Sequence, residues 1–425
     1  MKNQYPGFEI PYSPDLSPLL DGTVEINGRT LANRIVIQPM EGADGELDGS
    51  FGELTVRRYH RYAAGGAGLI WLEAASVVHE GRANPRQLYL CEATLDSFKR
   101  MVDDIKSISL KENGFEPVIL VQLTHSGRWS KPEHASAPLI AYENLEIDKI
   151  RPLPNAVIIS DEYCKKLEEM HGKAAALAEK AGFDGADIKS CHGYLLGEMF
   201  SAYSRPGSYG GSFDNRMRLI INCFAAAKAD TTKNFILTTR MNAYDGLVYP
   251  WGFGVNEKDG LKPDLTETFK LIDILTTQYG MSIVNMTAGI PYLNPHINRP
   301  ANTKINKSIE DPMKGVERIL GIARDVQRKF PNLPVVASGF AYLQRDTFAV
   351  GAGIIKENWA MLAGFGRQGF AYPNFAAHIK ENGNVEQKHC VACAKCSDLL
   401  RAGATSGCVV RDSKIYAEIF QKQVK

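Results

Sequence analysis

Residues 182–218, GFDGADIKSCHGYLLGEMFSAYSRPGSYGGSFDNRMR, decide how the rest of the chain is interpreted. The stretch opens on a short strand-like segment, residues 186–189, and then places Lys189, His192 and Tyr194 within six residues. The carboxyl end of a strand is where (β/α)₈ barrels carry their chemistry. A cation, an imidazole and a phenol held together can stabilise a developing oxyanion and deliver a proton. We therefore expect these three residues to form a catalytic group.

Strand-like and helix-like patterns alternate on both sides of this stretch. Short apolar runs predict eight strands, at 35–38, 69–73, 118–123, 186–189, 235–241, 282–286, 334–337 and 359–363. Helical patterns lie between them, at 54–64, 95–109, 161–181, 215–228, 265–277 and 309–330, with a short helix near Gln344. Such strict alternation favours an α/β fold of the closed (β/α)₈ TIM-barrel type over a doubly wound sheet.

Two kinds of connection fit this barrel. The dipeptide Asn27-Gly28 between alternating residues predicts a β-hairpin, which we expect to close the bottom of the barrel. The connections after strands are long, at 126–160, 242–262 and 287–307. Long loops on one face are expected to form the rim of an active site.

Composition limits the range of partners. The 425 residues are 44% hydrophobic and 23% charged, which is typical of a globular chain. A net charge of +1 and a pI near 7.6 give no basic footprint for nucleic acid. Because neither a membrane-spanning run nor a signal peptide is apparent, we expect a cytoplasmic protein with a small-molecule substrate and no membrane partner. The sequence leaves the oligomeric state open.

A cluster of cysteines lies near the end of the chain, where Cys390, Cys393, Cys396 and Cys408 follow the spacing C-x₂-C-x₂-C-x₁₁-C. In a reducing compartment, metal ligation is preferred over disulfides. Three closely spaced thiolates and a later fourth are typical of [4Fe–4S] sites, whereas structural zinc uses two separated C-x₂-C arms. We predict a barrel over residues 1–380 and a short cluster-binding tail over 381–425.

The central stretch resembles the Old Yellow Enzyme family of NADH:flavin oxidoreductases. The resemblance rests on His192-Gly193-Tyr194-Leu195 and on residues 209–218, YGGSFDNRMR. Further strand ends match in the same order, and the resemblance implies that they hold FMN: Pro39, Met40, Gln122, Arg240, Ser338, Gly339, Gly366 and Arg367. Gln122 would bond the edge of the isoalloxazine, Arg240 would offset the negative charge of the reduced ring, and the last four would hold the phosphate.

The resemblance also implies roles for the catalytic group. Tyr194 would protonate a substrate carbon and His192 would bond the substrate's carbonyl oxygen. Lys189 is a departure, because many members carry a second histidine there; it could stabilise an enolate or carboxylate, bond Glu198, or line the wall. Glu41 is a second departure, and its carboxylate would disfavour the reduced flavin unless it is protonated or turned away.

A cysteine cluster directly after the barrel resembles the branch of the family that contains 2,4-dienoyl-CoA reductase and trimethylamine dehydrogenase. Those enzymes continue into further domains for electron input, which this sequence does not contain. We therefore expect a separate redox protein to dock near the cysteines. The alternative is direct reduction of FMN by NAD(P)H, with a structural or vestigial cluster.

These inferences combine into an FMN- and [4Fe–4S]-dependent ene-reductase acting on an activated C=C bond of an enoate, enone or dienoyl thioester. One alternative is an amine or other substrate dehydrogenase that passes electrons out through the cluster. Such an enzyme would need an aromatic cage for an ammonium, and the loops offer Trp129, Tyr203, Tyr244, Trp251 and Tyr292. The other alternative is a non-catalytic redox subunit.

Overall fold

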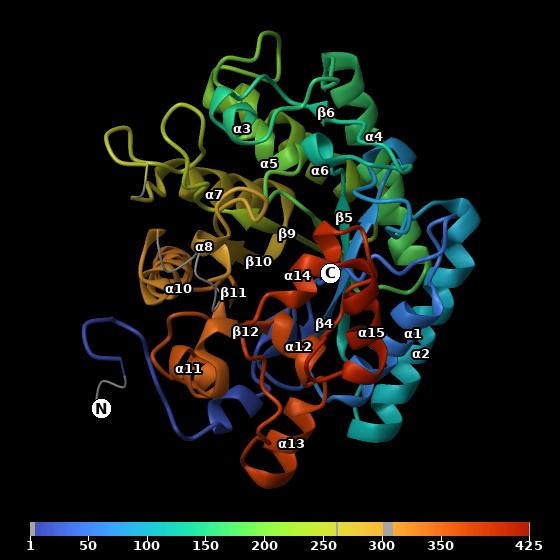
Figure 1. Cartoon of the computed structure of the whole chain (residues 1–425), viewed down its shortest axis with the longest axis vertical. Helices are drawn as coiled ribbons and strands as arrows, with labels where there is room; N and C mark the ends of the chain where they lie inside the picture. Colours follow the sequence, from blue (N-terminus) through green and yellow to red (C-terminus); the bar gives the residue numbers. More distant parts are fainter. Residues whose placement is uncertain (1–4, 261, 301–308, 425) are drawn as a thin grey trace.

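Eight parallel strands form a closed barrel in the computed structural model, which describes residues 5–260, 262–300 and 309–424 (Figure 1). Their order around the barrel is β3-β4-β5-β8-β9-β10-β11-β12, with β12 pairing back onto β3. The strands are β3 (Ile35–Ile37), β4 (Leu69–Ser76), β5 (Val118–Thr124), β8 (Gly185–Ile188), β9 (Ile236–Asn242), β10 (Met281–Thr287), β11 (Val335–Ala337) and β12 (Leu362–Phe365). The predicted TIM barrel is confirmed.

A helix follows each strand and covers the outside of the barrel. These helices are α1 (Glu53–Ala64), α2 (Leu95–Asn113), α4 (Asp161–Lys180), α6 (Phe213–Asp230), α7 (Thr266–Tyr279), α10 (Pro312–Lys329), α11 (Thr347–Lys356) and α13 (Phe375–Asn382). Individual residues define where several of these helices begin and end. Ser160 and Ser212 cap α4 and α6, because their side chains accept hydrogen bonds from backbone N–H groups, and Gly114 ends α2 with φ of 80°.

Successive side chains along each strand pack alternately into two separate apolar layers. The barrel interior is filled by residues such as Val36, Leu69, Trp71 and Leu120, all buried. Their neighbours, such as Ile70, point outward into the layer beneath the helices. Because both faces of a parallel sheet are covered, its strands appear as continuous apolar runs.

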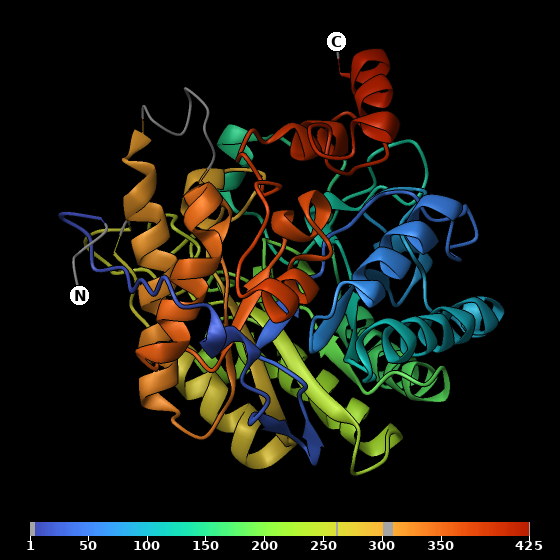
Figure 2. The ribbon, with the colours of Figure 1, turned by 90° about the horizontal axis from the view of Figure 1, so that it is seen from below.

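The predicted hairpin closes one end of the barrel. Strands β1 (Glu25–Ile26) and β2 (Arg29–Thr30) pair antiparallel about Asn27 and Gly28, both with positive φ. Val24, Ile26 and Leu31 pack onto the interior layer. The hairpin and the C-terminal tail lie at opposite ends of the barrel (Figure 2), so the carboxyl ends of the strands face the tail.

The short helix predicted near Gln344 corresponds to two consecutive elements. The segment around Gln344 is the irregular 3₁₀ segment η5 (Phe340–Asp346), in which Gln344 itself has non-helical angles, and the regular helix is α11. Most of α11 is buried, with the sequence TFAVGAGIIK. A helix buried on nearly all sides lacks the amphipathic pattern from which the other helices were predicted.

The connection from residue 126 to 160 is more ordered than a plain loop. It contains η4 (Gly127–Trp129), β6 (Leu139–Ile140), α3 (Leu145–Ile150) and β7 (Val157–Ile158). Arg128 holds this connection in place, because its guanidinium is fully buried, its Nε donates to Glu198 at 2.6 Å, and its Nη1 donates to Asp148 at 2.5 Å. Glu198 lies in α5 (Leu195–Met199), so the connection is fixed directly above the site.

The remaining short elements complete the connections and the tail. They are η1 (Ser17–Leu20), η2 (His79–Gly81), η3 (Glu92–Thr94), α8 (Pro295–Asn298), α12 (Arg367–Ala371), α14 (Lys395–Arg401) and α15 (Ser413–Gln423). Across the described residues, every helix is too short or too polar to cross a membrane. The division of the chain at residue 380 stays a prediction.

Candidate active site

The catalytic group predicted from the sequence lies where β8 ends. Lys189 follows Ile188, His192 adopts φ of 65° and Gly193 φ of 67°, and Tyr194 is the residue before α5. A positive φ is uncommon for a non-glycine residue and marks a backbone held by its surroundings. This sharp turn brings the three side chains to the same end of the barrel.

Lys189 and Tyr194 share a carboxylate. The Lys189 ammonium lies 3.6 Å from the centre of the Tyr194 ring and 3.4 Å from Glu41 Oε1. The Tyr194 hydroxyl is also 3.4 Å from Glu41 Oε1, and 3.2 Å from the hydroxyl of Tyr292. Burial, the charge of Glu41 and Tyr292 raise the pKa of Tyr194 well above its ordinary value. Lys189 therefore bonds Glu41, while Glu198, its other candidate partner, pairs with Arg128.

His192 is held as a neutral imidazole. Its backbone N–H donates to Asn242 at 3.3 Å, and its Nε2 lies 3.4 Å from the Thr287 hydroxyl. Burial lowers the pKa of His192 well below its ordinary value, and the nearby charges of Arg240 and Lys189 lower it further. A neutral imidazole can donate one hydrogen bond without bringing another charge into the site.

Beneath this group, the carboxylate of Asp187 joins two predicted flavin-binding residues. Asp187 accepts hydrogen bonds from Gln122 Nε2 at 2.6 Å, from the backbone N–H of Arg240 at 2.6 Å and from Trp71 Nε1 at 2.9 Å. Burial raises the pKa of Asp187 to about 6, and these hydrogen bonds oppose the rise. Because the amide nitrogen of Gln122 is committed to Asp187, its carbonyl oxygen is left to bond another group.

The guanidinium of Arg240 is free to bind an anionic group. Among the described residues its guanidinium has no hydrogen-bond or ion-pair partner, and its Nε is buried. Burial lowers the pKa of this side chain. A half-buried cation without a partner is costly, so this geometry fits a flavin ring whose reduced form carries negative charge.

The predicted phosphate residues follow β11 and β12. The Ser338 hydroxyl donates to the Met286 carbonyl at 3.0 Å, and Gly339 has φ of 100°. Arg367 is mostly buried and donates to the carbonyl of Pro300 at 3.2 Å. Glycine is required at 339, because an added Cβ would lie 2.6 Å from Ile319 in a strained backbone conformation.

The loop after β3 contacts this group and carries the other predicted residues, Pro39 and Met40. A Cβ on Gly366 would lie 3.1 Å from the sulfur of Met40, so these two strand ends touch. Gly42 donates its N–H to Glu73 at 2.9 Å. The buried Glu73 is held in turn by Arg58, which also pairs with Asp44. The loop that presents Glu41 is therefore rigidly supported from below.

The four tail cysteines influence one another and two arginines. Burial raises the pKa of Cys390 and of Cys396, and in both cases Arg367 opposes the rise. Burial and the neighbouring Arg367 lower the pKa of Arg299 to about 10, and the Arg299 Nε is buried without a partner. Arg367, predicted for the phosphate, thus lies between that site and the cysteines.

The backbone around the cysteines has features of a cluster-binding loop. The N–H groups of Ala392 and Arg411 lie 3.4 and 3.3 Å from the sulfurs of Cys390 and Cys408. Ala392 and Ala394 both have positive φ, at 52° and 61°. Hydrogen bonds to sulfur and a strained wrapping loop suit thiolate ligands of an iron–sulfur cluster. Within the described ranges, no three His, Cys, Asp or Glu side chains are gathered as a site for a single metal ion.

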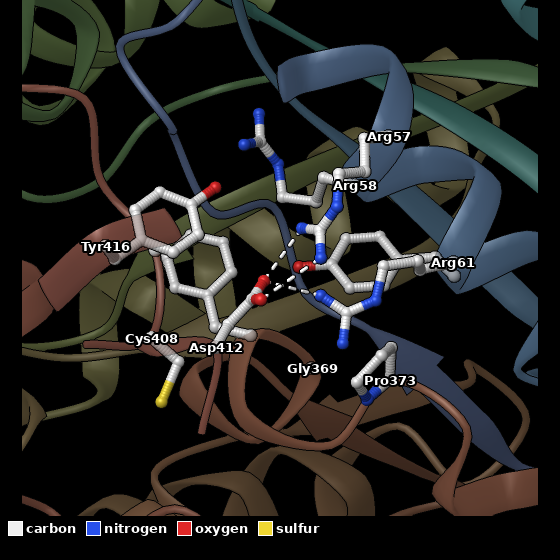
Figure 3. Close-up of a pocket in the computed structure, with 11 residues that line it drawn as sticks. Arg57, Arg58, Arg61, Gly369, Pro373, Cys408, Asp412 and Tyr416 are labelled. Atoms are coloured by element: carbon white, nitrogen blue, oxygen red, sulfur yellow. Dashed lines mark hydrogen bonds and ion pairs between the residues drawn. The ribbon is translucent and has the colours of Figure 1, made fainter. Parts of the chain in front are cut away.

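The tail is fastened to the barrel on both sides of Cys408. The N–H of Ser406 donates to the Gly42 carbonyl at 2.7 Å. On the other side, Asp412 accepts from Nη1 of Arg57 and from Nη1 of Arg61, each at 2.7 Å; Figure 3 shows both arginines directed at Asp412. The cysteine segment is therefore bonded directly to the loop that carries Glu41.

Of the five aromatic residues considered for a cage, the structure brings two together and gives the other three different partners. Trp129 and Tyr292 stack with ring centres 4.4 Å apart, and Tyr292 stacks on Tyr194 at 6.4 Å. Tyr203 packs on Tyr249, Trp251 packs on Tyr142, and Tyr244 donates to Gly260.

Sequence reasoning missed three features of the site. These are the pairing of Tyr292 with Tyr194, the anchor Asp187, and Arg299, whose Nε is buried without a partner. Asp187 carries a signal that could have found it, because an acidic residue inside a buried strand requires partners. The other two depend on contacts between distant loops and leave no local pattern.

Comparison with known proteins agrees with this geometry. The sequence profile described as "NADH:flavin oxidoreductase / NADH oxidase family" matches residues 23–268, more than half of the chain. This match, on a closed eight-stranded barrel, defines the class as a flavin oxidoreductase. The chain belongs to the NADH:flavin oxidoreductase / NADH oxidase family.

Curated relatives include the NADH oxidase of Thermoanaerobacter brockii, 26% identical over 421 residues, which cover 96% of this chain and 58% of that protein. The NADPH dehydrogenase of Bacillus subtilis is 32% identical over 201 residues, covering 46% of this chain and 56% of that protein. The chain therefore spans only about three fifths of the length of the Thermoanaerobacter relative.

Solved structures share the fold. A 2-naphthoyl-CoA reductase in complex with 2-naphthoyl-CoA aligns with a TM-score of 0.77 at 17% identity, covering 95% of this chain and 58% of that chain. The Old Yellow Enzyme from Pichia sp. AKU4542 aligns at 0.66 and 18% identity, covering 87% and 88% of the two chains.

Proposed function

We propose that this protein is an FMN-dependent ene-reductase that acts on an activated alkene conjugated to a carboxylate or thioester carbonyl. The observation that carries the proposal is the placing of Lys189, His192 and Tyr194 above the pair formed by Gln122 and Arg240. Family membership supports FMN as the cofactor and NADH or NADPH as a donor. Substrate class, residue roles and the need for iron and sulfide are parts of the proposal.

The residues that would hold FMN lie at the carboxyl ends of the barrel strands. Gln122 would bond the ring edge and Arg240 would lie against its pyrimidine side, while Ser338 and Arg367 would bind the phosphate. When bound and reduced, FMN supplies the hydride that an activated alkene accepts at its β-carbon.

The chain's own residues would supply the rest of the reaction. His192, neutral because its pKa is lowered, would donate to the substrate's carbonyl oxygen. Lys189 would stabilise the negative charge that gathers there. Tyr194, whose pKa is raised, keeps its proton until the α-carbon becomes basic enough to take it.

The surroundings disfavour an amine substrate. The Lys189 ammonium already lies on the Tyr194 ring, and it would repel a second cation. On the outer side, the guanidinium of Arg151 is 5.1 Å from the centre of the Trp129 ring and 5.9 Å from that of Tyr292. Protein cations therefore occupy the aromatic surface that an ammonium would need.

We further propose a [4Fe–4S] cluster on Cys390, Cys393, Cys396 and Cys408, with a separate redox protein as electron donor. The N–H···S contacts and the strained Ala392 and Ala394 support the cluster. The bonds that join the tail to the loop of Glu41 support electron exchange between cluster and flavin. The alternative, direct reduction of FMN by NAD(P)H, needs no partner.

Anaerobic spectroscopy tests the proposed reaction. The protein is purified without oxygen, its flavin is bleached with NADH, NADPH or dithionite, and its reoxidation is followed with a panel of enoates, enones, thioesters and amines. We expect the carboxylate-bearing and thioester-bearing alkenes to restore the flavin spectrum. A flavin that amines reduce would support the dehydrogenase, and one that responds to neither class would support the redox subunit.

The cluster is tested by Cys393→Ser, with Cys91→Ser as the matched control outside the tail. The first variant should lose iron and partner-driven turnover while it retains FMN. Full partner-driven activity without iron would make the cluster dispensable.

A further inference from the structure

Each turnover of the proposed reductase would leave Tyr194 without its proton, and that proton must be replaced. Tyr194 is 3% exposed, so bulk water does not reach it freely. Within the described residues, only Glu41 and Tyr292 lie within hydrogen-bond distance of its hydroxyl. One of these two groups therefore has to connect the phenol to solvent.

Glu41 is poorly suited to return a proton. Its Oε1 faces both the Lys189 ammonium and the Tyr194 hydroxyl, each at 3.4 Å, so it acts as an acceptor for two donors. An oxygen that faces an ammonium and a phenol hydroxyl serves as an acceptor in this arrangement, and a relay needs a donor.

Tyr292 has the properties that a relay needs. Its hydroxyl lies 3.2 Å from that of Tyr194, and the two rings stack at 6.4 Å, which fixes their relative orientation. Tyr292 as a residue is 37% exposed whereas Tyr194 is 3% exposed, so Tyr292 lies on the solvent side of the pair. Burial raises the pKa of Tyr292 to about 12, and burial, Glu41 and Tyr292 raise the pKa of Tyr194 well above its ordinary value, so a Tyr194 phenolate is a base strong enough to take a proton from Tyr292.

We propose that Tyr292 is the proton relay that recharges Tyr194 between turnovers, an inference that rests on the proposed ene-reductase function. The Tyr194 O–H bond breaks as a C–H bond forms on the substrate, which leaves a phenolate. The Tyr292 O–H bond then breaks as the Tyr194 O–H bond forms again. Tyr292 regains a proton from water or a buffer acid. Only protons move in these steps, because both electrons of the reduction arrive with the hydride.

The test compares the first turnover with later ones in Tyr292→Phe. FMN-loaded protein is reduced with dithionite and mixed with less than one equivalent of the best alkene, and the same alkene is then supplied in excess with dithionite as donor. The variant should match the wild type in the single turnover, because Tyr194 starts protonated. Its kcat in multiple turnovers should fall by about tenfold or more, with an increased solvent deuterium isotope effect.

Tyr249→Phe is the matched control. Tyr249 is also an exposed loop tyrosine, at 42%, but its ring packs on Tyr203. Tyr194→Phe should lose the single turnover itself. The contact is checked independently of activity by ¹⁹F NMR of fluorotyrosine-labelled protein: the resonance assigned to Tyr194 should shift in Tyr292→Phe and stay in place in Tyr249→Phe.

Three results would overturn the relay. They are an unchanged kcat in Tyr292→Phe, an equal loss in single and multiple turnovers, which indicates a merely structural role, and an unshifted Tyr194 resonance. If no alkene reoxidises the wild-type flavin even once, the proposed function fails, and the relay fails with it. If the wild type reacts and Tyr292→Phe reacts equally, only the relay fails.

Discussion

At the scale of single residues, the site combines groups whose ionisation is shifted in opposite directions. Burial and nearby cations depress the pKa of His192, whereas burial and a nearby carboxylate raise that of Tyr194. The imidazole therefore stays neutral and the phenol stays protonated over a wide range of pH. Environments that shift the pKa values of two neighbouring groups in opposite directions are typical of catalytic sites in which the two groups have different roles.

These shifts predict a flat pH profile. Activity that needs neutral His192 is lost only as pH falls below its depressed pKa, and activity that needs protonated Tyr194 is lost only as pH rises above its raised pKa. We expect kcat/KM for alkene reduction by pre-reduced protein to stay constant between about pH 7 and pH 9. An ionisation inside that range that disappears in His192→Asn or Tyr194→Phe would contradict this assignment.

The ion pair of Lys189 and Glu41 is expected to contribute to the stability of the fold. In Lys189→Met the partly buried Glu41 loses its cation, and the free energy of unfolding should fall by about 2 kcal/mol, measured by urea titration of the cofactor-free protein. The double variant Lys189→Met/Glu41→Leu should recover most of that loss.

Activity should respond differently from stability in the same variants. Without the ammonium, kcat/KM for an enoate should fall by about tenfold or more, whereas kcat/KM for its neutral methyl ester should change much less. An equal loss for both substrates would show that Lys189 does not interact with the substrate's carboxylate.

At the scale of elements, the tail is attached to the barrel through a small number of polar contacts. Asp412, at the start of α15, bonds Arg57 and Arg61 of α1, and Ser406 bonds the loop after β3 (Figure 3). The side chain of Asp412 is 11% exposed, so this interaction is better shielded than a surface salt bridge. The position of Cys408 between these two attachments is therefore fixed by the barrel.

This arrangement predicts that Asp412→Asn loosens the tail. The two arginines lose the charge of their shared partner, and we expect iron to be lost to a chelator several-fold faster, with earlier proteolysis after residue 383. The matched control is Asp398→Asn, which removes a more exposed acid of α14 that pairs with Arg401. Equal rates of iron release in the wild type and both variants would show that the ion pairs of Asp412 do not hold the cysteine segment.

At the scale of the whole molecule, the sequence predicted the features that depend on residues close together in the chain. Each strand is a short buried run next to a helical pattern, and the Asn27-Gly28 turn is specified by two residues, so both were predictable. The strand ends also placed Gln122 and Arg240 on one face, because the carboxyl ends of barrel strands point the same way.

Features that depend on distant contacts could not be predicted. The contact between Tyr292 and Tyr194 joins residues 98 positions apart, and the ion pair of Asp412 with Arg57 joins residues 355 positions apart. Such pairings depend on how long connections fold over the barrel, and no short sequence pattern encodes that. The grouping of strand-end residues at the carboxyl face was thus predictable, and the contacts made by the long connections above it were not.

The central claim is that FMN lies across the carboxyl ends of the strands, close to a four-iron cluster in the tail. The most direct measurement is the content of FMN, iron and acid-labile sulfide in protein purified without oxygen. The account predicts one FMN, four irons and four sulfides per chain, with FMN lost in Arg240→Met and iron lost in Cys393→Ser. A colourless protein that contains neither flavin nor iron under these conditions would contradict it.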